Sequence, residues 1–123
     1  MQGVVLDAGP FIALERRNPI VVHLVDRLFD ENISLLTSAA VVAQVWRGGS
    51  HQASLARLLA RTEVVALDAA VARFLGRLLG RSRMKDVVDA HVVWLAQTRN
   101  WRVLTSDPGD LRRLDASIEV VAI

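Results

Sequence analysis

The stretch from Asp86 to Leu111, DVVDAHVVWLAQTRNWRVLTSDPGDL, carries the clearest structural signal in this 123-residue chain. Its pattern predicts a helix, a turn, a short buried strand and a second turn that opens another helix. At about 100° per residue, the apolar side chains of the first helix share one face, and Asp89 lies at the edge of that face. We therefore expect Asp89 to be half buried, with Asp86 closer to solvent. Asp107 follows the apolar pair Val103-Leu104, where a parallel strand would end.

A further acid is predicted at the same edge of the sheet. The short apolar run Gly3-Val4-Val5-Leu6 predicts a buried strand, and it ends at Asp7, before the turn residues Gly9 and Pro10. In open α/β sheets, ligands bind at the carboxyl ends of the strands. Acids at two strand ends and an acid at the edge of a core-facing helix would therefore meet in one cleft.

The rest of the sequence alternates between strand and helix patterns. Strands are also predicted at residues 33–36, 64–67 and 118–123, and helices at residues 11–15, 19–31, 39–47, 50–61 and 69–80. This alternation predicts a single α/β domain over residues 1–123, with a five-stranded, mostly parallel sheet between two helix layers.

Composition narrows the class of protein. The chain has no cysteine, which excludes disulfides, zinc–thiolate sites and thiol catalysis and leads us to expect a cytoplasmic protein. No apolar run approaches the roughly 20 residues of a membrane span, so no membrane partner is expected. Lys85 is the only lysine among the 15 basic residues. Arginine suits bidentate phosphate contacts, although a compositional bias explains the same preference.

Converging carboxylates repel one another unless a positive charge lies between them. If Asp7, Asp89 and Asp107 converge, Mg²⁺ or Mn²⁺ would fit them, because these ions take carboxylate and water ligands. Such an ion activates water and stabilises the charge that develops in phosphodiester cleavage. Structural roles compete with this hypothesis, since Asp107 has the pattern of a helix N-cap and Asp86 suits a helix start. His91 lies in the apolar stripe, which is typical of a hydrogen-bonded core histidine.

Basic residues are predicted to flank the cleft. Arg16 and Arg17 follow the turn after the first strand, Arg47 follows the helix that contains Gln44, and Arg81, Arg83 and Lys85 form a loop before the Asp89 helix. We predict that Arg16, Arg47 and the three loop residues bind the phosphates of a nucleic acid on either side of the cleft. Solvated surface charge is the alternative for each of them.

Four segments resemble, in order and spacing, the successive motifs of one known family. They are Val5-Leu6-Asp7, residues 37–48 (TSAAVVAQVWRG), residues 86–90 (DVVDA) and residues 104–111 (LTSDPGDL). Together they resemble PIN-domain nucleases, and most closely the VapC-type toxins of bacterial toxin–antitoxin pairs. No single motif is specific, but four in register across the whole chain are a strong signal.

The resemblance implies a doubly wound α/β/α sandwich and Mg²⁺- or Mn²⁺-dependent endoribonuclease activity. It also implies a homodimer and a cognate VapB-type antitoxin whose C-terminal segment blocks the site. Asp7, Asp89 and Asp107 match family acids, and Asp110 matches an accessory one. We expect the helices at residues 19–31 and 50–61 to line a groove for an amphipathic antitoxin helix.

Gln44 departs from the family pattern, which has Glu at this position of the catalytic set. Glutamine keeps a carbonyl oxygen but loses one negative charge and cannot act as a base. It marks either an attenuated natural variant or a deliberate change that allows a toxic protein to be produced. Two other hypotheses stay open: an inactive PIN fold that acts only through its antitoxin complex, and a phosphoacceptor receiver domain. The single acid after the first strand argues against a receiver.

Overall fold

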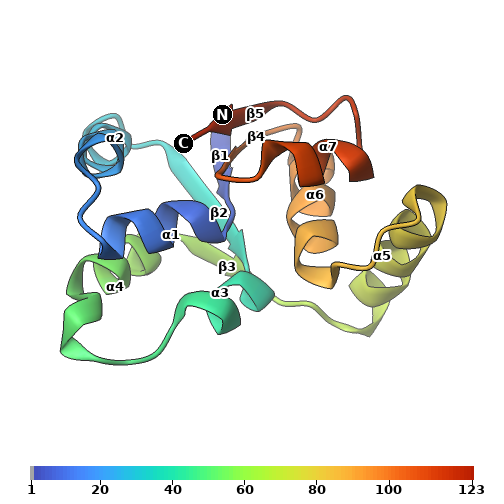
Figure 1. Ribbon diagram of the computed structural model, residues 1–123, viewed down its shortest axis with the longest axis horizontal. Coiled ribbons are helices and arrows are strands. Elements are labelled where there is room, and N and C mark those ends of the chain that lie inside the picture. The colour runs from blue at the N-terminus through green and yellow to red at the C-terminus, as the bar shows by residue number, and fades with distance from the viewer. Residues whose placement is uncertain (1) are drawn as a thin grey trace.

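Residues 2–123 are described by a computed structural model, in which a five-stranded sheet lies between two groups of helices (Figure 1). The strands are β1 (Gly3–Leu6), β2 (Ser34–Ser38), β3 (Glu63–Val65), β4 (Arg102–Thr105) and β5 (Val120–Ala122). Their order is β3-β2-β1-β4-β5, and each neighbouring pair is parallel. The predicted α/β fold is confirmed, and the sheet proves to be parallel throughout.

Helices cover both faces of the sheet. They are α1 (Ala8–Glu15), α2 (Pro19–Asp30), α3 (Ala39–Val45), α4 (Ala53–Ala60), α5 (Ala69–Ser82), α6 (Val87–Arg99) and α7 (Pro108–Leu114), with a 3₁₀ turn at Ser50–Gln52 before α4. Figure 1 shows α1, α2 and α4 to one side of the sheet and α5, α6 and α7 to the other. Within residues 2–123, no helix is both long enough and apolar enough to cross a membrane.

The strand order creates a switch point between β1 and β4. The chain passes from β1 to β2 on one side, and β4 later joins β1 on the other side. Leu6 pairs with Leu104 in the ladder, so Asp7 and Thr105 follow at the same carboxyl edge. Ligands of doubly wound sheets bind at such a reversal, because the helices diverge there and leave a crevice.

The start of α1 differs from the prediction. Gly9 and Pro10 were expected to form a turn, but they belong to the first turn of a helix that begins directly at Ala8. Proline is tolerated there because the first backbone N–H groups of a helix have no partner within it. The helix therefore starts immediately after Asp7 and fixes the acid at the end of β1.

The predicted loop at residues 81–85 is also shorter than expected. Arg81 and Ser82 form the end of α5, and Ser82 donates a hydrogen bond from its hydroxyl to the Leu78 carbonyl at 2.8 Å. Arg83 then takes a left-handed conformation with φ of 58°, which ends the helix. Only residues 83–86 link α5 to α6, which keeps the two helices close together.

Gln52 is a buried polar residue whose role the sequence analysis missed. Its amide oxygen accepts hydrogen bonds from the backbone N–H groups of Arg47 and Gly48 at 2.8 and 2.9 Å. Its amide nitrogen donates to the Glu15 carboxylate at 2.6 Å and to the Val45 carbonyl at 2.8 Å. With these bonds, one side chain ties the end of α3 and the following loop to the end of α1.

Candidate functional site

Asp7 and Asp107 are joined through the hydroxyl of Thr105. Asp7 is only 6% exposed, and its Oδ2 accepts a hydrogen bond from Thr105 Oγ1 at 2.8 Å. The same Oγ1 accepts a hydrogen bond from the backbone N–H of Asp107 at 2.9 Å. Thr105 therefore fixes both acids relative to β4. The sequence pointed to this residue only as part of the motif at residues 104–111, without a role of its own.

Close backbone packing also holds the two acid-bearing segments together. A Cβ added to Gly9 would lie 2.9 Å from the backbone nitrogen of Ser106 and 2.4 Å from its Oγ. Only glycine lets the first turn of α1 approach the loop after β4 this closely. The distance between Asp7 and Asp107 is thus set by backbone contact as well as by Thr105.

Asp86 and Asp89 stand together at the start of α6. The Oδ1 of Asp86 accepts a hydrogen bond from the backbone N–H of Asp89 at 3.0 Å, so Asp86 is the N-cap of the helix, as expected for a helix-start acid. Asp89 is half buried, as its place on the helix face indicated. Burial, followed by repulsion from Asp86, Asp7, Asp110 and Asp107, raises the pKa of Asp89 to about 7.

The five acids influence one another electrostatically. Burial is also the main cause that raises the pKa of Asp7, with smaller contributions from the charges of Asp107 and Asp86, while the bond from Thr105 partly opposes the rise. Asp107 occupies the N-cap position of α7, with Pro108 as the first helical residue, as its pattern predicted, but its carboxylate makes no capping hydrogen bond. Asp107 and Asp110 are both exposed, which leaves their carboxylates accessible to an incoming ligand.

Gln44 lies on α3, which begins at the carboxyl end of β2. Its side chain is exposed and forms no hydrogen bond to an acid in the described part of the chain. It therefore shares the carboxyl edge of the sheet with the acids without a hydrogen bond to them. Gln44 would join the same site only if a ligand or a bound ion spanned the space between its side chain and the acids.

The predicted basic residues are distributed unevenly around this edge. Arg16 follows the last residue of α1, about 13.5 Å along the helix axis from Asp7 at 1.5 Å per residue. Arg47 bonds through Nη1 to the carbonyls of Trp46 at 2.7 Å and Ala43 at 3.3 Å, so it caps the end of α3. Arg83 and Lys85 are exposed in the short segment that leads to Asp86, and Arg81 is exposed in the last turn of α5.

His91 is buried as predicted, but only one of its ring nitrogens has a partner. Its Nδ1 lies 2.6 Å from Ser38 Oγ, which also accepts the backbone N–H of Ala40 and so caps α3. Its Nε2 has no hydrogen-bond partner among the described residues. Burial lowers the pKa of His91, so the neutral ring links α6 to the start of α3.

The chemistry of these side chains fits a hard divalent cation, because carboxylate oxygens are the ligands that Mg²⁺ and Mn²⁺ prefer. Burial is the main cause of the raised pKa values of Asp7 and Asp89, and repulsion between the acids adds to it, so a cation at this edge would be favoured electrostatically. No group of three or more Asp, Glu or His side chains between residues 2 and 123 is close enough to share one ion. A common ion would therefore require the carboxylates to move closer together.

The chain is thus a doubly wound α/β protein with a parallel sheet and with carboxylates at the carboxyl edge of that sheet. The chain belongs to the PIN-domain family, whose model matches residues 4–117. The predicted family is thus confirmed, and membership supports a nuclease in general terms. No curated protein matches the sequence.

Solved structures with the same fold have low sequence identity. FitAB bound to an IR36 DNA fragment is 20% identical with a TM-score of 0.67, covering 97% of this chain and 94% of that chain. FitAcB from Neisseria gonorrhoeae is 21% identical with a TM-score of 0.64, covering 95% of each chain. PAE2754 from Pyrobaculum aerophilum is 16% identical with a TM-score of 0.61, covering 99% of this chain and 88% of the other. These similarities confirm the fold over nearly the whole length.

We expect the metal-free protein to lose stability as the pH rises from about 4 to about 7. The pKa of Asp89 rises from 3.8 to about 7 on folding, so the folded protein keeps a proton that the unfolded chain has released. That stabilising contribution disappears as the pH passes the folded pKa. Urea unfolding at several pH values in the presence of a chelator measures the slope.

The matched variant for this measurement is Asp89→Asn, which has no proton to lose and should flatten the slope. His91, whose lowered pKa gives a slope of opposite sign, is present in both proteins and cancels in the comparison. An identical pH dependence in the wild type and the variant would show that Asp89 titrates normally.

Proposed function

We propose that this chain is a Mg²⁺- or Mn²⁺-dependent endoribonuclease toxin that a cognate VapB-type antitoxin holds inactive. The observation that carries the proposal is the grouping of Asp7, Asp89 and Asp107 at the switch point, where the pKa of Asp89 rises to about 7. A phosphodiester would add further negative charge to this edge. Cleavage there needs a cation between the acids and the phosphate.

Asp7, Asp89 and Asp107 would hold the ion, with Asp110 and Gln44 in accessory positions. When bound, the ion supplies an activated water and stabilises charge on the phosphate. Thr105 orients the Asp7 carboxylate through its hydroxyl, which donates at 2.8 Å. Because the Asp89 carboxyl keeps its proton up to about pH 7, it must release that proton to act as a ligand, so ion affinity should increase with pH.

Cationic side chains beside the acids would bind the phosphates of the RNA chain. Arg81, Arg83 and Lys85 lead directly into the start of α6 and are exposed. Arg47 would have to exchange its two carbonyl contacts for a phosphate, and Arg16 would bind RNA at the far end of α1. On the basis of the resemblance to VapC-type toxins, we also propose that the chain forms a homodimer.

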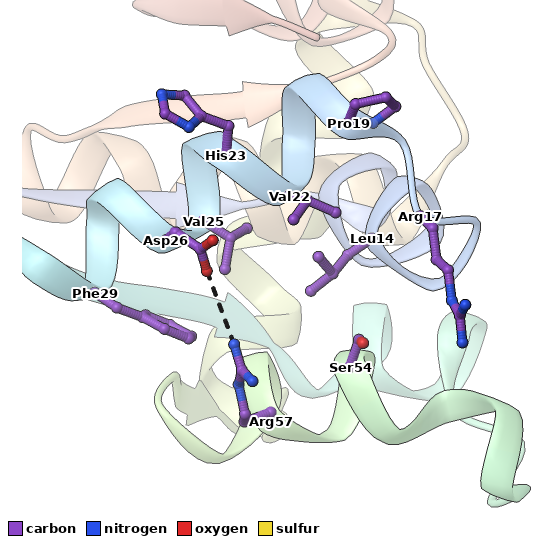
Figure 2. A pocket seen from close by; sticks show the side chains of 10 residues that line it. All are labelled: Leu14, Arg17, Pro19, Val22, His23, Val25, Asp26, Phe29, Ser54 and Arg57. Carbon is purple, nitrogen blue, oxygen red and sulfur yellow. Dashed lines mark ion pairs between the residues drawn. The ribbon is translucent and has the colours of Figure 1, made fainter.

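The groove between α2 and α4 suits the proposed antitoxin helix. A cavity of about 610 Å³ lies there, and Figure 2 shows Val22, Val25 and Phe29 of α2 directed toward α4. At its rim, Arg57 of α4 and Asp26 of α2 form an exposed ion pair at 3.8 Å. An apolar floor with charged edges is the usual site for an amphipathic helix. A basic antitoxin side chain would then reach the acids and replace the charge of the ion.

We expect Val22→Glu to prevent stable association with the antitoxin. The substitution places a charge in the half-buried lining of the groove, where an apolar helix face cannot solvate it. Co-expression from the native operon followed by affinity purification of the tagged chain measures association. Arg27→Gln, on the exposed side of α2, is the matched control and should leave association unchanged. Equal recovery of the antitoxin with both variants would contradict the docking site.

A second candidate is a catalytically inactive PIN fold that acts only through its antitoxin complex. Gln44 is the observation that favours it, because the site lacks one carboxylate of the family set. FitAB, one of the solved structures with this fold, is described bound to DNA, and operator binding by a complex would be the corresponding activity here.

The deciding experiment is an RNA cleavage assay on this chain, with total cellular RNA and Mn²⁺ or Mg²⁺. We expect slow cleavage that a chelator abolishes and that Asp107→Asn eliminates. Absence of cleavage in this chain and in a Gln44→Glu variant, across many RNAs, would favour the inactive candidate.

A further inference from the structure

Helix α5 carries a row of arginines on its exposed side. Arg73, Arg77 and Arg81 are spaced four residues apart, so each is rotated only about 40° from the previous one, and all three are exposed. Helix α5 contains no acidic residue. None of the three arginines forms an ion pair with the described residues.

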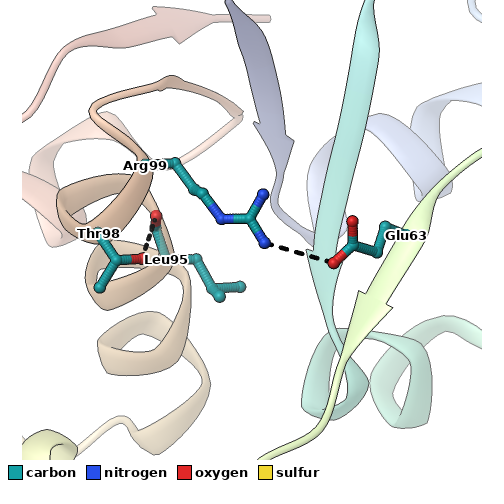
Figure 3. Close-up of polar contacts among 4 residues, drawn as sticks. All are labelled: Glu63, Leu95, Thr98 and Arg99. Atoms are coloured by element: carbon teal, nitrogen blue, oxygen red, sulfur yellow. Dashed lines mark hydrogen bonds and ion pairs between the residues drawn. The ribbon is translucent and has the colours of Figure 1, made fainter. Parts of the chain in front are cut away.

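Four other arginines, Arg27, Arg57, Arg99 and Arg102, form ion pairs with carboxylates. Arg99, for example, lies 3.4 Å from the Glu63 carboxylate at the amino edge of the sheet, where α6 ends (Figure 3). Arg102 pairs with Glu119 at 3.2 Å. The α5 row therefore differs from these exposed arginines in having no carboxylate to bind.

An aromatic side chain lies beside this row. Phe74 is 49% exposed and stacks on Trp94 of α6, with ring centroids 5.9 Å apart and planes inclined by 24°. The guanidinium carbon of Arg77 lies 5.7 Å from the Phe74 ring centroid. Proteins bind single-stranded nucleic acid with arginines that contact successive phosphates and with aromatic rings on which bases stack.

The neighbouring surface of α5 is open. A Cβ added at Gly76 or Gly80 would meet no atom within 4 Å, so nothing in the described chain covers this side of the helix. A second copy of the chain is a poor occupant, since a two-fold interface centred on this row would bring like charges together. A polyanion matches the row in charge.

The row leads to the acid cluster. Helix α5 packs against α6 and α7, which carry Asp89 and Asp110. After Arg81 the chain continues through Arg83 and Lys85 directly to Asp86. Figure 1 shows α5 outside α6, on the side away from α1 and α2. A strand held at the acids would therefore meet α5 on leaving them.

We propose that α5 binds the single-stranded RNA segment that flanks the cleavage site. Phosphates contact Arg73, Arg77 and Arg81 in succession, and one base stacks on Phe74. This inference rests on the proposed endoribonuclease function, and it extends the substrate path beyond the residues at the acid edge. It gives the protein affinity for single strands without requiring a base sequence, because stacking and phosphate contacts accept any base.

The test measures binding of a labelled single-stranded RNA of about 20 nucleotides, longer than one typical binding site, by fluorescence anisotropy over a salt series. The full chain carries Asp7→Asn to prevent cleavage. We expect Arg73→Gln/Arg77→Gln to flatten the slope of log affinity against log salt by about 1.4, from about 0.7 per lost phosphate contact. The control Arg99→Gln/Arg102→Gln removes the same charge at the opposite edge and should leave the slope unchanged. Circular dichroism verifies that both double variants are folded.

Phe74→Leu separates stacking from charge. We expect it to weaken binding of single strands about tenfold with no change in salt slope. Binding of a duplex RNA should not change, because its bases are already stacked within the helix.

An unchanged slope in the α5 variant, or an equal loss in the control, would overturn the inference. Cleavage is measured separately, with Asp7 retained. If this chain cleaves RNA and the Arg73→Gln/Arg77→Gln substitutions change neither binding nor cleavage, the proposed function stands and the α5 assignment fails. If no form of the chain binds or cleaves RNA, both fail. Loss of antitoxin association with unchanged RNA binding would assign α5 to a protein partner and likewise overturn the inference.

Discussion

Asp7→Asn is expected to lower RNA cleavage by more than about 100-fold, because it removes a buried ligand charge from the proposed ion site. The same substitution should raise the melting temperature at pH 8. Asp7 is only 6% exposed, and burial raises its pKa, so its ionised form is costly in the folded protein. Asparagine has the same shape, keeps an oxygen that accepts the Thr105 hydrogen bond, and carries no charge.

The stability gain should depend on pH in a defined direction. As the pH falls toward 4, Asp7 of the wild type becomes protonated in the folded state and its cost vanishes, so the two melting temperatures converge. Calorimetry with a chelator at pH 4.5 and pH 8, combined with the cleavage assay, measures both effects. A variant that melts lower at pH 8, or that retains full cleavage, would contradict the role given to Asp7.

Gln44→Glu is expected to bind Mn²⁺ and Mg²⁺ about tenfold more tightly and to cleave RNA faster. The substitution restores a carboxylate at an edge that already holds five acids, and its negative charge favours a cation more than an amide does. Because Gln44 is exposed and free of hydrogen bonds to the acids, the change should not disturb the fold. Without a cation, the added charge should raise the pKa of Asp89 further.

Titration calorimetry of both proteins with Mn²⁺ compares the affinities directly. Gln97→Glu is a matched control, since it adds the same charge on α6 at a residue whose amide bonds Asp115 at 2.9 Å, away from the acids. Equal affinities for this chain and Gln44→Glu would show that position 44 does not contribute to the ion site.

The sequence predicted the strands and the positions of Asp7 and Asp107 at the strand ends because these depend on local patterns. A buried run that ends in Asp7, and another that ends before Asp107, place both acids at one edge once the sheet is parallel. The half-buried position of Asp89 followed from helical periodicity alone. The resemblance in four motifs predicted the family, whose model matches residues 4–117.

Other features depend on contacts between distant parts of the chain, which no local pattern contains. Thr105 and Gln52 act through hydrogen bonds to residues that are 98 and 37 positions away, so their roles appear only in the folded protein. The early start of α1 was missed because Gly9 and Pro10 are typical of turns. Here glycine is required by the approach of Ser106, and proline occupies the first helical turn.

The pairing of β1 with β4 also determines when the acid cluster can exist during synthesis. Asp7 and Thr105 are separated by 98 positions, and contacts of such long range form late in folding. As the chain leaves the ribosome, β1 can pair at first only with β2, and its other edge stays open until β4 has been made. A chain that ends before β4 would therefore contain Asp7 and Asp89 but would lack β4, Thr105 and Asp107.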